Sequence, residues 1–275
     1  MFIITTITGY ENQQLFNAAS KKFDDVRVIN PDNIFWSFGT LVNIWYQNKP
    51  IVYSEVDGCI IRSHSNSKAV LGKYLATANC KNVDPVERFV TSGIPKMHSE
   101  LMRQFSVGEN MPVSHFAFNY ETLYTHRDLI GFYPLVYKPV QGAHGRDMKL
   151  VTNQSELLNV ARTHYFSKPI FFQQYITAEK EYRAIMYNGK IINIAEKVLK
   201  EKKLFSGRKF VKVESIPYGM IKYLEFYAKR GLVGIDIIID KNENYVILEQ
   251  NRAPEFEHID NATGLNTAQL IMDTM

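Results

Sequence analysis

Cysteine and tryptophan are scarce in this chain of 275 residues, which contains two of each. The N-terminal segment lacks the basic residues and the apolar length of a secretory signal, so Cys59 and Cys80 fit a reducing cytosol better than a disulfide framework. No apolar run approaches the length of a membrane span. These absences predict a cytoplasmic protein with no membrane partner.

A strong charge imbalance is also missing, because the formal net charge is only +4. Nucleic-acid-binding domains typically carry a clustered basic stripe, so we expect no nucleic-acid partner. The clearest basic run, Lys197 to Lys212, is interpreted as a solvated loop, with a lid over an acidic substrate as the alternative. The absence of a G-x-G-x-x-G fingerprint argues against a dinucleotide-binding domain.

The first hundred residues alternate short apolar runs with helical patterns, which is typical of a small α/β unit around a parallel sheet. The apolar runs predict strands at Phe2–Thr6, Val26–Ile29, Ile51–Tyr53 and Cys59–Ile61. The helical patterns cover Glu11–Lys22, Val42–Tyr46 and Lys68–Thr77.

The rest of the chain turns from mixed patterns to mostly β patterns. Its middle part predicts helices at Lys96–Phe105, Glu121–Asp128 and Gln154–His164, and strands at Pro112–Phe118, Pro134–Lys138 and Met148–Val151. The last third predicts strands at Ile170–Ile176, Glu181–Tyr187 and Lys190–Ala195, a turn at Asn188-Gly189, and helices at Tyr218–Lys229 and Thr263–Met275. The predicted fold class is therefore α/β followed by α+β.

A β-hairpin is predicted near the C-terminus, where two apolar runs flank a polar turn. The runs are Ile235–Ile239 and Tyr245–Leu248. If Lys241–Asn244 is the loop, Asp240 faces Tyr245 and the register of the whole hairpin follows by counting.

That register places Asp236 opposite Glu249, and Asn251 points to the same face because it lies two residues further on. Opposed carboxylates repel each other, and oxygen ligands suit a hard cation such as Mg²⁺. A metal site is one interpretation of this face. An ordinary acidic solvent face of a hairpin is the other.

Three features upstream suit other parts of a nucleotide. Lys96 begins a predicted helix, and Lys138 leads into a loop with Gly142 and Gly145. Lysines act as point charges on phosphates, and glycines let backbone N–H groups approach them closely. The strand segment Gln173–Ile176 can offer backbone groups to an adenine edge.

In this order the features resemble the ATP-grasp superfamily, and most closely its RimK-like ligases, the type that adds glutamates to a ribosomal protein. The likeness covers Gly93 to the C-terminus well and the preceding residues loosely. The matching stretches are Gly93-Ile-Pro-Lys96, Val136-Tyr-Lys138-Pro-Val-Gln-Gly142-Ala-His144-Gly145-Arg146, Phe172-Gln-Gln174-Tyr-Ile176, Lys180-Glu181-Tyr-Arg183, Gly234-Ile-Asp236 and Glu249-Gln-Asn251-Arg-Ala-Pro254. The sequence departs from the family pattern at Ala143-His144, where a small hydroxyl residue is usual, and at Gln174, where an acid is frequent.

The resemblance implies an ATP-grasp fold with a small N-terminal α/β pre-grasp domain at residues 1–92. It implies a central subdomain with the phosphate loop at residues 93–169. A C-terminal subdomain with the adenine hinge and the metal hairpin would cover residues 170–275.

The resemblance also implies roles for individual residues. Arg183 and Lys138 would be catalytic, with Arg183 as a clamp on the transferred phosphate, and Glu181 would accept the ribose hydroxyls. The implied nucleotide-binding set is Lys96, Lys138, Gly142, His144, Gly145, Gln173, Gln174, Tyr175, Ile176 and Glu181. The metal ligands would be Asp236, Glu249 and Asn251, and the substrate contacts Arg62, His64 and Arg208.

Structural alternatives stand beside several of these roles. Lys96 and Lys138 also fit ordinary surface lysines. Arg183 also fits a structural ion pair with Glu181 or Glu196, and His144 a cap of the glycine loop.

The implied activity is that of an ATP-dependent carboxylate–amine ligase, which forms an acyl phosphate and then an amide and releases ADP and phosphate. Its cofactors would be ATP and one or two Mg²⁺ ions, with Mn²⁺ as an alternative. A non-catalytic ATP-binding regulatory or scaffolding module is the alternative function. The implied partners are small-molecule, peptide or protein substrates and further copies of the chain in a dimer or tetramer. The sequence does not identify the carboxylate or the amine, nor whether the product is an extended tail, a dipeptide or a macrocycle.

Overall fold

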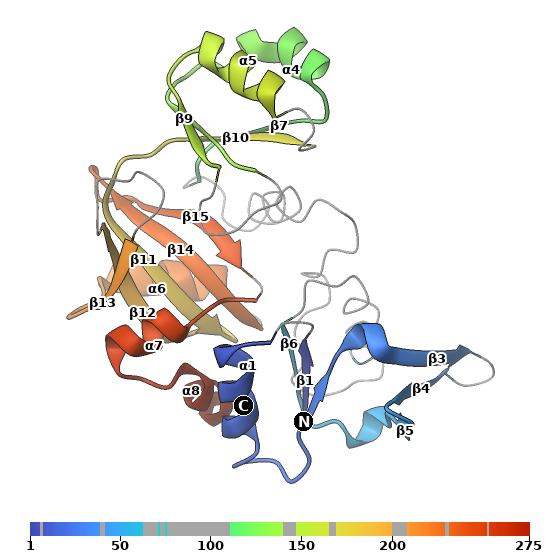
Figure 1. Ribbon diagram of the computed structural model, residues 1–275. Helices are drawn as coiled ribbons and strands as arrows, with labels where there is room; N and C mark the ends of the chain where they lie inside the picture. Colours follow the sequence, from blue (N-terminus) through green and yellow to red (C-terminus); the bar gives the residue numbers. More distant parts are fainter. Residues whose placement is uncertain are drawn as a thin grey trace.

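The computed structural model describes residues 1–5, 8–38, 42–62, 71, 75, 111–139, 147–164, 169–199, 208–228, 231–251 and 253–275. Within these ranges the strands form four sheets. Figure 1 shows the N-terminal lobe in blue, the central lobe in green and yellow, and the C-terminal lobe in colours from gold to red. The predicted helix at Lys96–Phe105, the glycine loop after Pro139 and most of the predicted helix at Lys68–Thr77 lie outside the described residues.

The N-terminal lobe is built on a parallel sheet with the strand order β2-β1-β6, so the predicted α/β unit is confirmed. Its elements are β1 (Phe2–Thr5), α1 (Tyr10–Ala19), β2 (Arg27–Ile29) and β6 (Cys59–Arg62). Buried Ile3 and Ile60 from the sheet and Leu15 from α1 share one core. A short apolar strand followed by an amphipathic helix buries its apolar side in this way.

A second, antiparallel sheet with the order β3-β4-β5 extends from this lobe, and here two predictions were wrong. Its strands are β3 (Ile34–Phe38), β4 (Val42–Tyr46) and β5 (Lys49–Pro50), between the short 3₁₀ helices η1 (Pro31–Asn33) and η2 (Tyr53–Glu55). The segment predicted as a helix is β4, because Ile44 is buried and Gln47 and Asn48 adopt the positive φ angles of a tight turn. The strand predicted at Ile51–Tyr53 instead ends in η2.

The central lobe is an antiparallel sheet with the order β7-β10-β8-β9, covered by two helices (Figure 1). Its elements are β7 (Ser114–Ala117), α4 (Tyr120–His126), η4 (Arg127–Leu129), β8 (Leu135–Tyr137), β9 (Lys149–Val151), α5 (Gln154–Thr163) and β10 (Ile170–Gln174). Asn119 and Asn153 cap α4 and α5 with side-chain oxygens. β10, which the sequence analysis assigns to the C-terminal subdomain, pairs here with β7 and β8.

The C-terminal lobe is a five-stranded antiparallel sheet with the order β13-β12-β11-β14-β15. Its elements are β11 (Ala178–Tyr187), β12 (Lys190–Leu199), β13 (Arg208–Lys212), α6 (Tyr218–Tyr227), β14 (Leu232–Asp240), β15 (Tyr245–Asn251), α7 (Glu257–Thr263) and α8 (Thr267–Thr274). The predicted closing helix is wrong in extent, because α7 ends at Gly264 in the left-handed conformation before α8 begins.

Helices α7 and α8 pack between the N-terminal lobe and the C-terminal sheet. Ile259 of α7 and Ile271 of α8 lie in the same buried cluster as Ile3 and Leu15 of the first lobe. The cluster also contains Tyr187 and Leu232 of the large sheet. The end of β6 is therefore held against the segment that follows β15.

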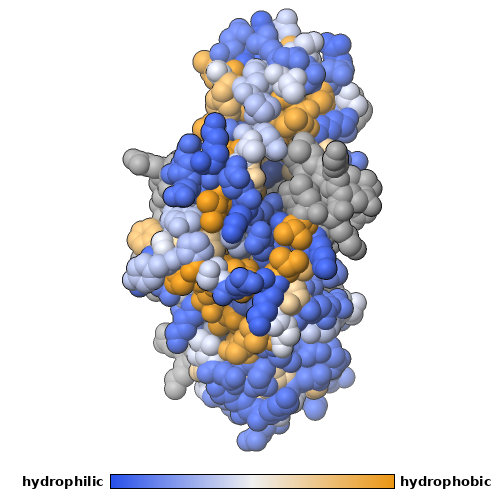
Figure 2. Space-filling model, turned by 90° about the vertical axis from the view of Figure 1, so that its left-hand side faces the viewer, coloured by the Kyte–Doolittle hydropathy of each residue, from blue (hydrophilic) through white to orange (hydrophobic). Residues whose placement is uncertain are grey.

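The surface mixes hydrophilic and hydrophobic residues. On the side that carries β13, Figure 2 shows apolar residues in clusters separated by hydrophilic ones. None of the helices in the described ranges has both the length and the hydrophobicity needed to cross a membrane.

Candidate active site

Four charged side chains meet on three adjacent strands of the large sheet. Glu181 and Arg183 lie on β11, Lys197 on β12 and Asp236 on β14. The guanidinium of Arg183 donates from Nε to Oδ1 and from Nη2 to Oδ2 of Asp236, both at 2.7 Å. The ammonium of Lys197 lies 2.7 Å from Oδ2 of Asp236 and 3.2 Å from Oε1 of Glu181. The result is a chain of alternating charges.

Strand register explains why these side chains share a face. Arg183 is paired with Asp236 on one side and with Ala195 on the other. Lys197 lies two residues beyond Ala195, so its side chain points to the same face as that of Arg183. The predicted structural partners of Arg183, Glu181 and Glu196, are not its partners here, because Asp236 takes both hydrogen bonds.

Both members of the central pair stay charged. Burial alone would raise the pKa of Asp236, but Arg183 and Lys197 outweigh it and hold that pKa below its usual range. Burial opposes the charge on Arg183, but Asp236 first, and then Glu249 and Glu255, raise its pKa above the usual value. An Asp whose pKa is depressed in the folded state stabilises the fold at neutral pH and loses that effect only in acid.

The predicted metal ligands lie on one face of the β14–β15 hairpin. Asp236 is paired with Glu249, as predicted, and Asn251 is paired with Gly234 two positions along. Asp236 is buried, whereas Glu249 is exposed, so a ligand can reach the pair from the solvent side. The predicted pairing of Asp240 with Tyr245 is wrong, because Ile239 takes that place.

The residues present fit a hard cation. Asp236 and Glu249 supply carboxylate oxygens and Asn251 an amide oxygen, which already accepts from the N–H of Ala253 at 3.0 Å. Oδ1 of Asp236 accepts one hydrogen bond and can accept a second interaction. Within the described ranges no three His, Cys, Asp or Glu side chains group closely enough to hold a metal alone. An ion here would share its coordination with substrate oxygens, as Mg²⁺ usually does.

A second polar group lies in the central lobe, where Lys138 follows β8. Its ammonium donates to Oε1 of Gln173 on β10, and the side chain of Gln173 is almost fully buried. Gln173 donates in turn to the hydroxyl of Ser114 at 3.2 Å. Lys138 is therefore held in place as a half-buried cation and is not a freely exposed surface lysine.

The predicted adenine hinge connects the two sheets, because the chain leaves β10 at Gln174 and enters β11 at Ala178. The N–H of Gln174 donates to the carbonyl of Val113, and that of Tyr175 to the carbonyl of Pro134. The side chain of Gln174 accepts from the N–H of Val113 at 3.3 Å. Since two hinge N–H groups are engaged, other polar groups of the hinge would have to bind an adenine edge.

Arg62 is a predicted substrate residue that the structure places in the protein interior. Its side chain is only 1% exposed, and it donates to Oδ1 of Asn12 and to the carbonyl of Pro254. Burial lowers the pKa of Arg62 to about 10, and Glu11 and Glu255 counteract this effect. Arg62 therefore joins the N-terminal lobe to the segment after β15.

Several predicted site residues cannot be placed. Lys96, His64, Gly142, His144 and Gly145 lie outside the described residues. Arg208 is described only as backbone at the start of β13.

Lys197 is the site residue that sequence analysis missed, because it was read as part of a solvated basic run. That interpretation is wrong for Lys197, whose side chain is 8% exposed. The run also contains strand structure, since the end of β12 pairs with β13. Strand alternation counted from the Asn188-Gly189 turn could not place it either, because a register shift in the β11–β12 pair turns Lys197 to the other face.

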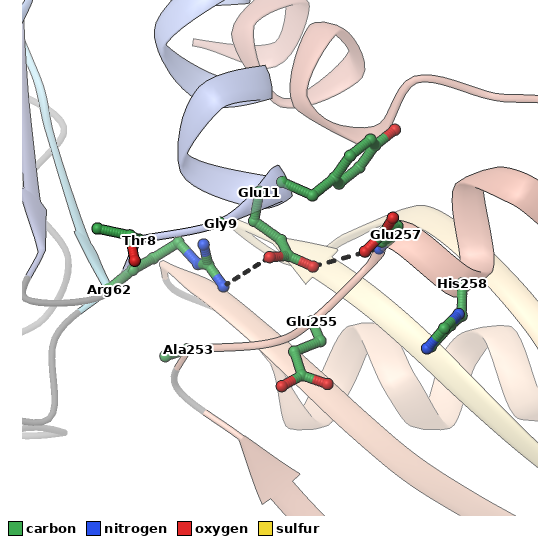
Figure 3. Close-up of a pocket in the computed structure, with 9 residues that line it drawn as sticks. Thr8, Gly9, Glu11, Arg62, Ala253, Glu255, Glu257 and His258 are labelled. Atoms are coloured by element: carbon green, nitrogen blue, oxygen red, sulfur yellow. Dashed lines mark hydrogen bonds and ion pairs between the residues drawn. The ribbon is translucent and has the colours of Figure 1, made fainter.

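A cavity of about 350 Å³ lies where the N-terminal lobe meets the segment after β15 (Figure 3). Its walls are Thr8, Gly9, Tyr10, Glu11 and Arg62 on one side and Ala253, Glu255, Glu257 and His258 on the other.

Comparison with known proteins agrees with the predicted family. The model of the RimK-like ATP-grasp domain matches residues 96–275. A protein described as a probable alpha-L-glutamate ligase from Maridesulfovibrio salexigens is 23% identical over 286 residues, which cover 96% of this chain and 90% of that protein.

Two solved structures have the same fold. The ATP-grasp ligase PsnB, complexed with a minimal precursor, Mg and ADP, aligns with a TM-score of 0.71 at 14% identity, over 99% of this chain and 95% of PsnB. The macrocyclase MdnC from Microcystis aeruginosa MRC, bound with the precursor peptide MdnA, aligns with a TM-score of 0.67 at 15% identity, over 99% and 98% of the two chains. The predicted fold is therefore confirmed.

Proposed function

Because the chain belongs to the RimK-like ATP-grasp family, we propose that it is an ATP-dependent carboxylate–amine ligase. The observation that supports this most directly is the charged cluster of Arg183, Lys197 and Asp236 behind the exposed carboxylate of Glu249. A ligase of this kind must bring an anionic carboxylate to an anionic triphosphate. Two fixed cations, Arg183 and Lys197, beside oxygen ligands for a metal ion meet that need.

Asp236, Glu249 and Asn251 are the residues proposed to hold magnesium. When bound, the ion supplies positive charge that offsets the phosphate oxygens. Arg183 and Lys197 keep the carboxylate of Asp236 ionised and fixed in orientation.

The proposed reaction has two steps. A substrate carboxylate oxygen bonds to the γ-phosphorus of ATP while the bond from that phosphorus to ADP breaks. An amine nitrogen then bonds to the activated carbonyl carbon, phosphate leaves with the electron pair, and the amine proton passes to water. Arg183 is proposed to stabilise the transferred phosphoryl group and Lys138 the other phosphates, because guanidinium and ammonium groups bind such oxygens well.

Peptide or protein substrates are proposed for the carboxylate. Support comes from PsnB and MdnC, which were solved with a precursor and a precursor peptide.

The proposal is tested by measuring ADP release from Mg-ATP with a panel of peptides and amines, and by mass spectrometry of the products. We expect ADP release that depends on substrate, and a condensed product lighter than its two components by one water. Arg183→Lys keeps the charge but loses the planar fork, so it should reduce turnover at least tenfold. Arg127→Lys in the central lobe is the matched control and should leave turnover unchanged.

Two results would overturn the proposal. If Mg-ADP does not bind to the folded chain, the proposed nucleotide site is ruled out. Mg-ADP that binds without any substrate-stimulated turnover would instead identify a non-catalytic ATP-binding module.

A further inference from the structure

Lys197 lies two strands away from Asp236, and its side chain reaches across the strand between them. The sheet order is β12-β11-β14, and neighbouring strands lie about 4.8 Å apart, so the backbones of β12 and β14 are separated by about 10 Å. The ammonium of Lys197 nevertheless lies 2.7 Å from Oδ2 of Asp236. Only a long side chain can make this contact from β12.

The same ammonium contacts a second carboxylate on the way, that of Glu181 on β11, at 3.2 Å from Oε1. Tyr182 is paired with Glu196, so Glu181 and Lys197 are neighbours across the two strands. The side chains of Glu181, Lys197 and Asp236 are 8%, 8% and 10% exposed. A lysine this deeply buried is rare unless it is paired, and here one ammonium is paired with two carboxylates.

Charge balance at Asp236 does not require Lys197, because Arg183 already donates to both oxygens of that carboxylate. What Lys197 adds is a link from Asp236 on β14 to Glu181 on β11. Its place in the cluster is therefore explained by geometry rather than by charge alone.

The backbone is also adapted to this contact. A register shift in the β11–β12 pair, between Ile185 and Met186, turns Lys197 toward Asp236. Without the shift, Lys197 would point to the opposite face, where Ala184 and Ile194 pack in an apolar cluster. Irregularities of this kind occur beside active sites, where they redirect a side chain.

We propose that Lys197 is a positioning residue, which fixes Glu181 and Asp236 in one arrangement for the nucleotide and its metal ion. This inference rests on the proposed ligase function and deepens it, because the family resemblance assigns Glu181 to the ribose hydroxyls and Asp236 to magnesium. Lys197 acts through these two carboxylates. Ribose recognition and metal binding then depend on a single side chain.

If Lys197 acted only through its charge, its removal would have the opposite effect. Without a cation beside them, both carboxylates would attract hydroxyl donors and Mg²⁺ more strongly, so both would bind more tightly. Loss of a positioning residue instead leaves the carboxylates misplaced and weakens both contacts. The two explanations therefore differ in sign.

The test is a calorimetric titration of the full chain, in the presence of Mg²⁺, with ADP and with an ADP analogue that lacks both ribose hydroxyls. The unmodified chain should bind ADP at least about tenfold more tightly than the analogue, because hydroxyls donate to a charged acceptor. Lys197→Met keeps an apolar stem but lacks the ammonium, so this preference should fall to within about threefold. The affinity of the ADP-bound chain for Mg²⁺ should fall at least about tenfold.

Lys209→Met is the matched control, because Lys209 is an exposed lysine on the neighbouring strand β13, and this variant should keep both affinities. Lys197→Arg keeps a long cation that can contact both carboxylates, so it should retain most of the preference for ADP. Lys197→Gln is too short to cross β11 and should show the same losses as the methionine variant. It takes the place of that variant if methionine prevents folding.

The inference is overturned if the variants without the ammonium keep the preference for the ribose hydroxyls, or if they bind Mg²⁺ as tightly as the unmodified chain. Either result leaves the proposed function standing, since the unmodified chain still binds Mg-ADP. An unmodified chain that does not bind Mg-ADP defeats the proposed function, and the inference with it.

Discussion

Replacing Asp236 by asparagine is expected to reduce the free energy of unfolding by about 3–5 kcal/mol and to lower turnover more than about a hundredfold. The substitution keeps the shape of the side chain but removes the charge that Arg183 and Lys197 both bind. Two buried cations then face a neutral amide whose NH₂ group cannot accept a hydrogen bond. Urea unfolding with an unchanged m-value measures the first effect, and ADP release at a temperature where the variant is folded measures the second.

Two further variants separate stability from chemistry. Glu243→Gln removes an exposed charge from the loop of the same hairpin and should change the free energy of unfolding by less than about 0.5 kcal/mol. Adding Arg183→Met to Asp236→Asn removes an uncompensated cation and should recover part of the stability but none of the activity. An asparagine variant with wild-type turnover would show that the negative charge of Asp236 is not needed for the reaction.

The metal face could be predicted from sequence because two irregularities in the hairpin cancel. Counting from a four-residue loop pairs Asp236 with Glu249, and this pairing is found. The real ladder begins one residue earlier, at Ile239 and Tyr245, and a bulge between Asp236 and Ile237 restores the count. The residue types alone indicated oxygen ligands on this face. The correct pairing of Asp236 with Glu249 depended on a bulge that the pattern of apolar residues does not reveal.

Lys197 could not be placed from the sequence because the β11–β12 pair also contains a register shift. In this pair no second irregularity cancels the shift. The Asn188-Gly189 turn is correct, and regular counting from it pairs Arg183 with Ile194, which puts Lys197 on the opposite face. A register shift between Ile185 and Met186 moves the partner to Ala195 and turns Lys197 toward Asp236. A one-residue slip exchanges the two faces of a strand, so local pattern alone could not decide.

In the N-terminal lobe, prediction from the sequence failed for a different reason. Val42–Tyr46 was predicted as a helix, but the segment forms a strand that pairs with β3 and buries Ile44. Arg62 was predicted as a substrate contact, whereas the structure buries it against Pro254 through packing between lobes far apart in sequence. Contacts of this kind are set by tertiary structure and leave no periodic signal.

The second large effect that we expect is a loss of stability when Gly234 is replaced by alanine. A Cβ atom at this position would lie 2.6 Å from Cβ of Pro254, which is closer than two carbon atoms can pack. Gly234 is paired with Asn251, and Pro254 holds Arg62 through its carbonyl. Displacing Pro254 therefore disturbs both the metal face and the junction between lobes. We expect a loss of about 1–3 kcal/mol in the free energy of unfolding, measured by urea denaturation.

Gly131→Ala is the matched control, because nothing lies within 4 Å of a Cβ atom there and its φ angle is not in the left-handed region. Alanine at that position should leave the stability unchanged or raise it by up to about 1 kcal/mol, since it reduces the entropy of the unfolded chain. A double-mutant cycle then isolates the steric cause. Pro254→Gly removes the opposing Cβ atom, so Gly234→Ala should cost less than about 0.5 kcal/mol in that background. If the cost is the same in both backgrounds, the close approach to Pro254 is not the reason for glycine at this position.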